Sequence, residues 1–350
     1  MKLGKLNKKY LNHFLLQKLG RTRTNVIKGA SFGVDTAIID LGRDQRLIVS
    51  SDPATYIPSL GLKESAWLTV ILSANDIATS GLLPQYAQFV LHLSKTISRK
   101  DFESYWYYIH EICSDIGIAI TGGHTGFDFV ENTTLSGGVT MFALGEAKEI
   151  KSAAYAVLND DIILTKTAAL SGSAILAKSF PKYVKSNLGL NYYNVLKNSF
   201  YDTSVLKEVH VLRNEPSVYQ GVNAMHDVTE GGVLGAIYEL SYASKLGVKI
   251  DKNAIFIDEE QKAICDLFAI SPYRTLASGC LLITCDKEYT NAILNLLKNH
   301  NIPAGVVGEL KPIEEGRKII DMHNNMQELE YWESDPYWNA FSEALNNQLN

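Results

Sequence analysis

The first half of the chain alternates between two hydrophobic patterns. From Ala37 to Ser50, apolar residues recur at every second position on both sides of a Gly-Arg-Asp turn, which predicts a hairpin of two strands. From Glu64 to Gly81, apolar residues recur at helical spacing and the run ends at a glycine, a common helix terminator. A strand at 84–94 and an amphipathic helix from Arg99 to Asp115 are expected next.

The alternation restarts in the second half, after an expected strand at 133–147. The predicted elements are a strand and a glycine-led helix within 159–180, a helix from about Gly232, a strand at 278–285, a helix at 289–300, a strand at 304–310 and a terminal helix whose tryptophans pack on the body. A chain of 350 residues is long enough for two cores. We therefore predict an α/β (α+β) protein with domains at residues 1–154 and 155–350.

Composition narrows the class of protein. An apolar fraction of 46% and a charged fraction of 20% are ordinary for a folded globular protein, and a net charge of −5 gives no indication of a nucleic-acid partner. No apolar run approaches the roughly 20 residues that a membrane helix needs, and the lysine-containing N-terminus lacks the pattern of a secretory signal. We expect a cytoplasmic protein without a membrane partner, whose four cysteines are buried core thiols.

Acidic residues and glycines recur where strands begin or end. Gly29, Gly33 and Asp35 precede the first expected hairpin. Glycines let the backbone approach a phosphate closely, but an aspartate there repels phosphate unless a cation lies between them. Asp52 ends a strand, where α/β proteins commonly place ligands. Hairpin entry for the first loop and an ordinary Asp-Pro turn for the second remain alternatives.

Two further stretches carry polar residues in apolar surroundings. Asn75 and Asp76 interrupt an apolar helical pattern, and a buried carboxylate needs a partner. In "AITGGHTGF", a Gly-Gly turn at Gly122 and Gly123, followed by His124 and Thr125, could bind an anion or a metal. A histidine satisfied within a loop is the alternative for the second stretch. The five residues Asn75, Asp76, Gly122, Gly123 and Thr125 are candidate ligand contacts.

The stretch "MHDVTEGGVLGAIYELS" combines acidic residues with a Gly-Gly pair at the start of a helix. Asp227, Glu230, Gly231 and Gly232 could together hold a charged ligand. Capping of the helix by Asp227 or Thr229 is the alternative.

These loops are most informative as a set. They occur in both halves of the chain, whereas the Walker A motif and the GxGxxG fingerprint are missing. Carboxylates, water and phosphate oxygens are the ligands that a hard divalent ion prefers. The set therefore favours a nucleotide whose phosphates are bound through Mg²⁺ by several carboxylates.

The same loops, in order, resemble a known superfamily. The matching motifs are "GASFGVDTA", "SSDP", "NDIATSG", "TGGHT", "DVTEGGVLGAIYE" and "ASGCLLIT". They closely resemble the aminoimidazole ribonucleotide synthetase-like superfamily, over roughly residues 29–310. The last two look most like the hydrogenase maturation factor and the synthetase-related proteins close to it.

The resemblance implies two α/β domains, a homodimer in which the N-terminal domains form a β-barrel, and phosphoryl transfer from ATP to an oxygen of a small molecule. It implies Asp35, Asp52 and Asp76 as Mg²⁺ ligands. The implied nucleotide contacts are Gly29, Gly33, Asn75, Gly122, Gly123, Thr125, Gly231 and Gly232. His124, Asp227 and Glu230 are the candidate substrate or proton-handling groups.

Several features of the chain depart from particular members of the superfamily. The hydrogenase factor ends in a carrier cysteine, whereas the last cysteine here is Cys285. Selenophosphate synthetase has a reactive cysteine or selenocysteine near its N-terminus, whereas the first cysteine here is Cys113. The thiamine-monophosphate kinase usually has an aspartate where this chain has His124. The alternatives are a dehydratase without the carrier tail, a kinase of the thiamine-monophosphate type, and a nucleotide-binding partner without turnover.

Overall fold

The computed structural model describes residues 3–54, 56–127 and 135–349, which form two compact units. The N-terminal unit comprises Thr24–Gly29 and Thr36–Ile150. The C-terminal unit comprises the chain from Lys151 onward together with residues up to Arg23 and Ala30–Asp35. Two early segments therefore group with the second half of the chain, a feature that a simple division at residue 154 does not contain.

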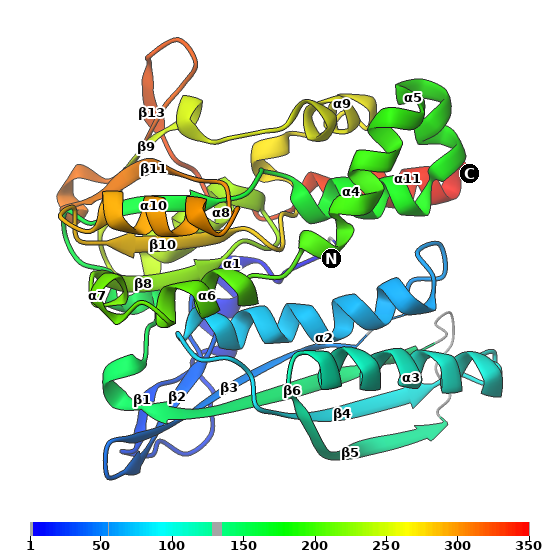
Figure 1. The fold of residues 1–350 in the computed structure, drawn as a ribbon, viewed down its shortest axis with the longest axis horizontal. Helices are drawn as coiled ribbons and strands as arrows, with labels where there is room; N and C mark the ends of the chain where they lie inside the picture. Colours follow the sequence, from blue (N-terminus) through cyan, green and yellow to red (C-terminus); the bar gives the residue numbers. More distant parts are fainter. Residues whose placement is uncertain (1–2, 55, 128–134, 350) are drawn as a thin grey trace. The chain divides into compact units, whose positions relative to one another are not determined.

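The N-terminal unit is a six-stranded sheet with two long helices (Figure 1). Its elements are β1 (Val26–Lys28), β2 (Ala37–Gly42), β3 (Gln45–Pro53), α2 (Leu62–Thr79), β4 (Tyr86–Leu93), α3 (Arg99–Asp115), β5 (Ala119–Phe127) and β6 (Leu135–Glu146). The strand order is β1-β2-β3-β6-β4-β5, and every described pair is antiparallel except β4 with β5. The predicted hairpin, helices and strands are confirmed. Thr133 and Thr134, at the start of the expected middle strand, lie outside the described residues.

Helices α2 and α3 cover one face of this sheet (Figure 1). Residues of β4 alternate between buried and exposed, so that Phe89 packs edge-on against Trp106 of α3 while Tyr86 and Val90 remain 40% and 39% exposed. Strand β6 shows the same alternation, and Phe142 lies opposite Tyr86. One face of the sheet is therefore core and the other is partly apolar and open.

The C-terminal unit contains a seven-stranded sheet of order β13-β12-β9-β11-β7-β10-β8. Its elements are β7 (Asp161–Thr165), α4 (Leu170–Ser179), α5 (Pro181–Asn198), α6 (Leu206–Arg213), α7 (Pro216–Tyr219), β8 (Val222–Asp227), α8 (Gly232–Ala243), β9 (Gly247–Asp251), α9 (Glu259–Leu267), β10 (Leu281–Cys285), α10 (Thr290–Asn299), β11 (Ala304–Lys311), β12 (Arg317–Ile320), β13 (Met326–Glu328) and α11 (Pro336–Asn346). The described pairs are antiparallel except β9 with β12. The elements predicted for this half are confirmed, including the terminal helix.

The core of the C-terminal unit surrounds α8. Val233, Ile237 and Leu240 of this helix belong to one cluster with Leu164 of β7 and Leu282 of β10. Strand β8 and its neighbour β10 are buried along almost their whole length. Because buried strands are closely packed, the residues at the end of β8 are held in fixed positions. The same unit includes α1 (Lys8–Tyr10), which is capped by the side chain of Asn7 and runs into a π-helical turn.

All four cysteines are buried and free, as predicted. In the described ranges, no helix combines the length and apolar character needed to cross a membrane.

Candidate functional site

The turn between β8 and α8 depends on its two glycines. Gly231 and Gly232 have φ of +85° and +61°, a region that favours glycine. A Cβ on Gly232 would lie 2.7 Å from the carbonyl oxygen of Thr275, so a side chain cannot be accommodated without movement. The N-cap of α8 is Gly231, which has no side chain to cap the helix, and its own N–H donates to Oδ2 of Asp335 over 2.8 Å. The alternative that Asp227 or Thr229 caps this helix is therefore wrong, although the helix begins at Gly232 as expected.

Three ligand-type side chains meet at the end of β8. Asp35, His226 and Asp227 each offer a ligand atom, and these atoms all lie within 4.8 Å of one another. His226 and Asp227 are 3% and 2% exposed. Asp35 reaches them from a loop that needs a glycine, because a Cβ on Gly33 would lie 2.3 Å from the carbonyl oxygen of Glu239. The candidate centre is thus built from β8 and the loop before β2.

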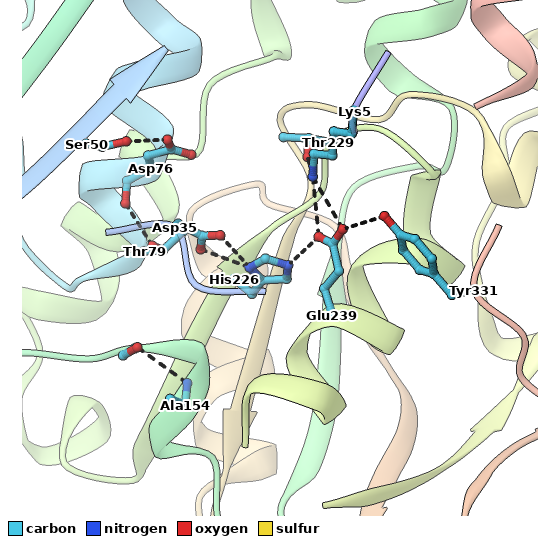
Figure 2. Close-up of polar contacts among 11 residues, drawn as sticks. Lys5, Asp35, Ser50, Asp76, Thr79, Ala154, His226, Thr229, Glu239 and Tyr331 are labelled. Atoms are coloured by element: carbon cyan, nitrogen blue, oxygen red, sulfur yellow. Dashed lines mark hydrogen bonds and ion pairs between the residues drawn. The ribbon is translucent and has the colours of Figure 1, made fainter. Parts of the chain in front are cut away.

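The imidazole of His226 lies between two carboxylates, as Figure 2 shows. Its Nδ1 is 2.8 Å from Oδ1 of Asp35, and its Nε2 is 3.3 Å from Oε2 of Glu239. Burial disfavours the imidazolium, but the two carboxylates outweigh burial and raise the pKa of His226 to about 10. At neutral pH both ring nitrogens therefore carry protons and donate, one to each carboxylate.

Glu239 of α8 has three further contacts. The side-chain Nζ of Lys5 lies 3.4 Å from each of its two carboxylate oxygens, and the hydroxyl of Tyr331 donates to it over 3.3 Å. Burial opposes ionisation of Glu239, yet the positive charges of Lys5 and His226 lower its pKa to about 2. The site is consequently a chain of alternating charges, Lys5–Glu239–His226–Asp35 (Figure 2).

The structure brings together some of the residues predicted for this unit. Asp35 and Asp227 lie in one cluster, and Glu230 is in the adjoining turn, where its carboxylate accepts the backbone N–H of Lys5 over 2.7 Å. The sequence pattern assigned no role to His226, Glu239 or Lys5. Glu239 carried a usable signal, because it interrupts an apolar helical run in the same way as Asp76.

In the N-terminal unit, Asp52 and Asp76 lie at the helix-covered face of the sheet. Asp52 is two residues beyond Ser50 on β3, and alternate residues of a strand point to the same face. The hydroxyl of Ser50 donates to Asp76 of α2 (Figure 2). Asn75, the preceding residue, is fully buried. The expectation that α2 buries polar residues is confirmed.

The expected Gly-Gly turn at Gly122 and Gly123 is wrong. Both residues lie inside β5, where Gly123 is opposite Phe89 of β4 and His124 is opposite Val90. A Cβ on Gly123 would lie 1.8 Å from the carbonyl oxygen of Phe89, so the glycine permits close strand pairing. His124 and Thr125 are exposed on this edge strand. They are therefore accessible from a strand edge, not from a loop.

The donor set at the end of β8 suits a hard divalent cation. Asp35 and Asp227 supply carboxylate oxygens, which Mg²⁺ prefers, in a buried setting. Both nitrogens of His226 already donate to carboxylates, so this ring orients an acidic ligand better than it could bind a metal itself. The carboxylates of Asp35 and Asp227 are thus the ligands that suit a cation, and the imidazolium of His226 orients Asp35.

Comparison with known families assigns the fold. Residues 33–146 match the model of the AIR synthase related protein N-terminal domain, and residues 159–320 match that of the C-terminal domain. Together these matches cover most of the chain. The protein belongs to the AIR synthase-related family and has its mixed α/β two-domain fold.

The chain is also similar to proteins with named activities, at identities of 24% or less in the three examples that follow. The chain is 24% identical over 297 residues to carbamoyl dehydratase HypE of Cupriavidus necator, covering 83% of this chain and 80% of that protein. A structure of the hydrogenase maturation protein HypE with ATP aligns over 96% of this chain and 97% of that one, with a TM-score of 0.69 and 18% identity. A ThiL structure with AMPPCP and TMP aligns over 91% and 96%, with a TM-score of 0.69 and 16% identity. At these identities, the structural likeness establishes the fold alone.

Proposed function

We propose that this protein is an ATP- and Mg²⁺-dependent enzyme that phosphorylates or otherwise activates an oxygen of a small-molecule substrate. The observation that carries the proposal is the cluster of Asp35, His226 and Asp227 at the end of β8. The family fold in which it lies also occurs in structures with ATP and AMPPCP. Buried carboxylates are costly to maintain, and clusters of them are typical of ligand sites. ATP and Mg²⁺ are accordingly the proposed cofactors.

The proposed metal ligands are Asp35, Asp52 and Asp76, and the cluster adds Asp227 as a further candidate. Mg²⁺ would neutralise charge on the transferring phosphoryl group. The imidazolium of His226 would hold Asp35 in one orientation by donating from Nδ1. Asp227 is the last residue of β8 and Glu230 lies in the turn before α8, where the N-terminus of the helix favours an anion.

Nucleotide contacts are proposed for the glycine-containing segments of both units. They comprise Gly29, Gly33, Asn75, Gly122, Gly123, Thr125, Gly231 and Gly232. The backbones of Gly33 and Gly232 lie so close to the backbones of Glu239 and Thr275 that neither position has room for a side chain. His124, exposed on β5, is proposed as a contact for the substrate.

Carbamoyl dehydration is a second candidate reaction. It is supported by the likeness to HypE of Cupriavidus necator over 83% of this chain. Both candidates share ATP-dependent activation of an oxygen and differ in the acceptor. ADP formation with different acceptors would identify the acceptor, because only the correct one would raise the rate above the level with ATP alone. Phosphate release would then separate the two reactions, because dehydration expels the activated oxygen as free phosphate, whereas a kinase leaves the phosphoryl group on its product.

We also propose that the protein is a homodimer whose N-terminal units pair through the open face of the six-stranded sheet. Tyr86 and Val90 of β4 are 40% and 39% exposed on this face, and Leu144 of β6 is 39% exposed. Apolar residues gathered on an uncovered sheet face are typical of a protein interface. A partner subunit would bury them and could close the sheets into a barrel.

Isothermal titration tests the proposed function directly. Wild-type protein is titrated with ATP in the presence and in the absence of Mg²⁺, and the experiment is repeated with Asp76→Asn. We expect Mg²⁺-dependent binding that the substitution abolishes. If folded wild-type protein binds none of ATP, ADP and AMPPCP, the proposed function is wrong.

A further inference from the structure

The N-terminal segment, defined as residues 3–19, contacts the turn that follows Asp227. The backbone N–H of Lys5 donates to Glu230 over 2.7 Å, and its Nζ donates to the hydroxyl of Thr229 over 3.0 Å. These contacts span 225 and 224 positions of sequence within the C-terminal unit. Lys5 therefore joins the chain start to the turn between β8 and α8.

Local sequence allows this close approach. Gly4 has φ of +98°, and a Cβ at this position would lie 2.5 Å from Oε2 of Glu230 and 2.7 Å from Nε1 of Trp338. This φ favours glycine, and any other residue would require the side chains of Glu230 and Trp338 to move. Gly4 thus lets the backbone come close enough to the turn for Lys5 to contact Glu230.

Lys8 anchors the segment three residues further on. Its Nζ lies 4.2 Å from the ring centroid of Tyr242, 4.5 Å from that of Tyr238 and 5.3 Å from that of Phe32. It also donates to the hydroxyl of Tyr238 over 2.8 Å. An ammonium group enclosed by several aromatic faces is held by cation–π attraction. The anchor fixes where Lys5 can reach.

The charge of Lys5 acts on a buried group. Glu239 has a side chain that is only 5% exposed, and a buried carboxylate needs compensating positive charge. Lys5 provides part of this compensation and His226 the rest. Without Lys5, Glu239 would draw the imidazole more strongly, and the opposing contact between His226 and Asp35 would weaken.

We propose that Lys5 is a positioning residue for the Mg²⁺ and nucleotide site, because its ammonium group holds Glu239 and thereby keeps His226 against Asp35. The proposal rests on the proposed function for its consequence in binding. The N-terminal segment then serves to deliver one positive charge to Glu239, which also accepts a hydrogen bond from His226.

Titration of single and double variants tests this coupling. Lys5→Met should weaken MgATP binding about tenfold, whereas Lys9→Met, which removes an exposed charge from the same segment, should leave it unchanged. Lys5→Arg should restore most of the affinity, since it retains the charge. In a Glu239→Gln background, Lys5→Met should have no further effect, because its partner is already neutral. Wild-type affinity in Lys5→Met, or an equal loss in both backgrounds, would overturn the proposal.

A readout without nucleotide separates this inference from the proposed function. The ring nitrogen resonances of His226, assigned with His226→Gln, report its contacts with Asp35 and Glu239 at a fixed pH. They should shift in Lys5→Met and in Gly4→Ala but not in Lys9→Met. Unchanged resonances in the first two variants would refute the positioning role even if MgATP binds. Shifted resonances in a protein that does not bind MgATP would support the Lys5 contact while the proposed function fails.

Discussion

Nδ1 of His226 lies 2.8 Å from Oδ1 of Asp35, although 191 positions separate the two residues. The histidine comes from the last residues of a buried strand, and the aspartate comes from a loop that precedes the first hairpin. Both side chains are almost inaccessible to solvent, at 3% and 9% exposure. Such a buried charged contact favours one arrangement of two distant segments, because removal of either partner would leave the other charge buried and uncompensated.

Replacement of His226 should be costly for stability. His226→Gln would leave the buried carboxylates of Asp35 and Glu239 without their shared cation, so we expect a loss of about 3 kcal/mol in the free energy of unfolding. Urea denaturation followed by circular dichroism measures this loss. His110→Gln is the matched control, because His110 has a 62% exposed side chain and should change stability by less than about 0.5 kcal/mol. Equal stabilities of the two variants would contradict the proposed charge chain.

The Glu239 carboxylate should make stability sensitive to acid. Its pKa is about 2 in the folded protein and near 4.5 in an unfolded chain, so its contribution is complete above pH 4.5. As pH falls from 4.5 towards 2, this contribution is lost. Glu239→Gln should therefore be less stable than wild type at pH 7, and the difference should shrink on acidification. A stability difference that stays constant between pH 7 and pH 3 would argue against a charged Glu239.

Pairing of β5 with β4 should depend on Gly123 more than on its neighbour. Gly123→Ala would place a Cβ 1.8 Å from the carbonyl oxygen of Phe89, and separation of the strands should cost at least about 2 kcal/mol. Gly122→Ala is the control, since no atom lies within 4 Å of the point that its Cβ would occupy and only backbone strain remains. Amide hydrogen exchange of β4 and β5 should quicken markedly in the first variant alone. Equal protection in both variants would disprove the close approach.

The open sheet face should determine the oligomeric state. Val90→Asp places a charge on this face, and we expect sedimentation velocity to show conversion of a dimer to a monomer at micromolar concentration. Tyr107→Asp is the control, because Tyr107 is 56% exposed on α3, on the helix-covered side. A wild-type protein that sediments as a monomer would exclude the proposed homodimer.

Local periodicity was sufficient to predict most elements of the fold. The helix expected from Arg99 to Asp115 has these bounds in α3, because its apolar residues recur at helical spacing over several turns. The glycine pair in β5 misled the prediction, since glycines at a strand edge carry no alternating pattern and resemble a turn. Their meaning depends on Phe89, a residue of the neighbouring strand.

The candidate site was predictable only in part for the same reason. Asp35 and Asp227 stood out because each is an acidic residue near glycines. Lys5 had no such context, and its role arises from a contact with Glu239 that spans 234 positions. Long-range pairing of charges leaves no local periodic signal in the sequence. The contacts among Lys5, Glu239 and His226 could therefore be identified only from the structure.

The proposed Mg²⁺ site is tested most directly by a Mg²⁺-dependent ATP titration of three variants beside wild type. Asp35→Asn and Asp227→Asn remove carboxylates of the cluster, and Asp115→Asn removes an exposed carboxylate at the end of α3. We predict that wild type and Asp115→Asn bind ATP about equally and only with Mg²⁺, and that both cluster variants bind at least about tenfold more weakly. Wild-type affinity in both folded cluster variants would contradict a role for Asp35 and Asp227 in binding MgATP.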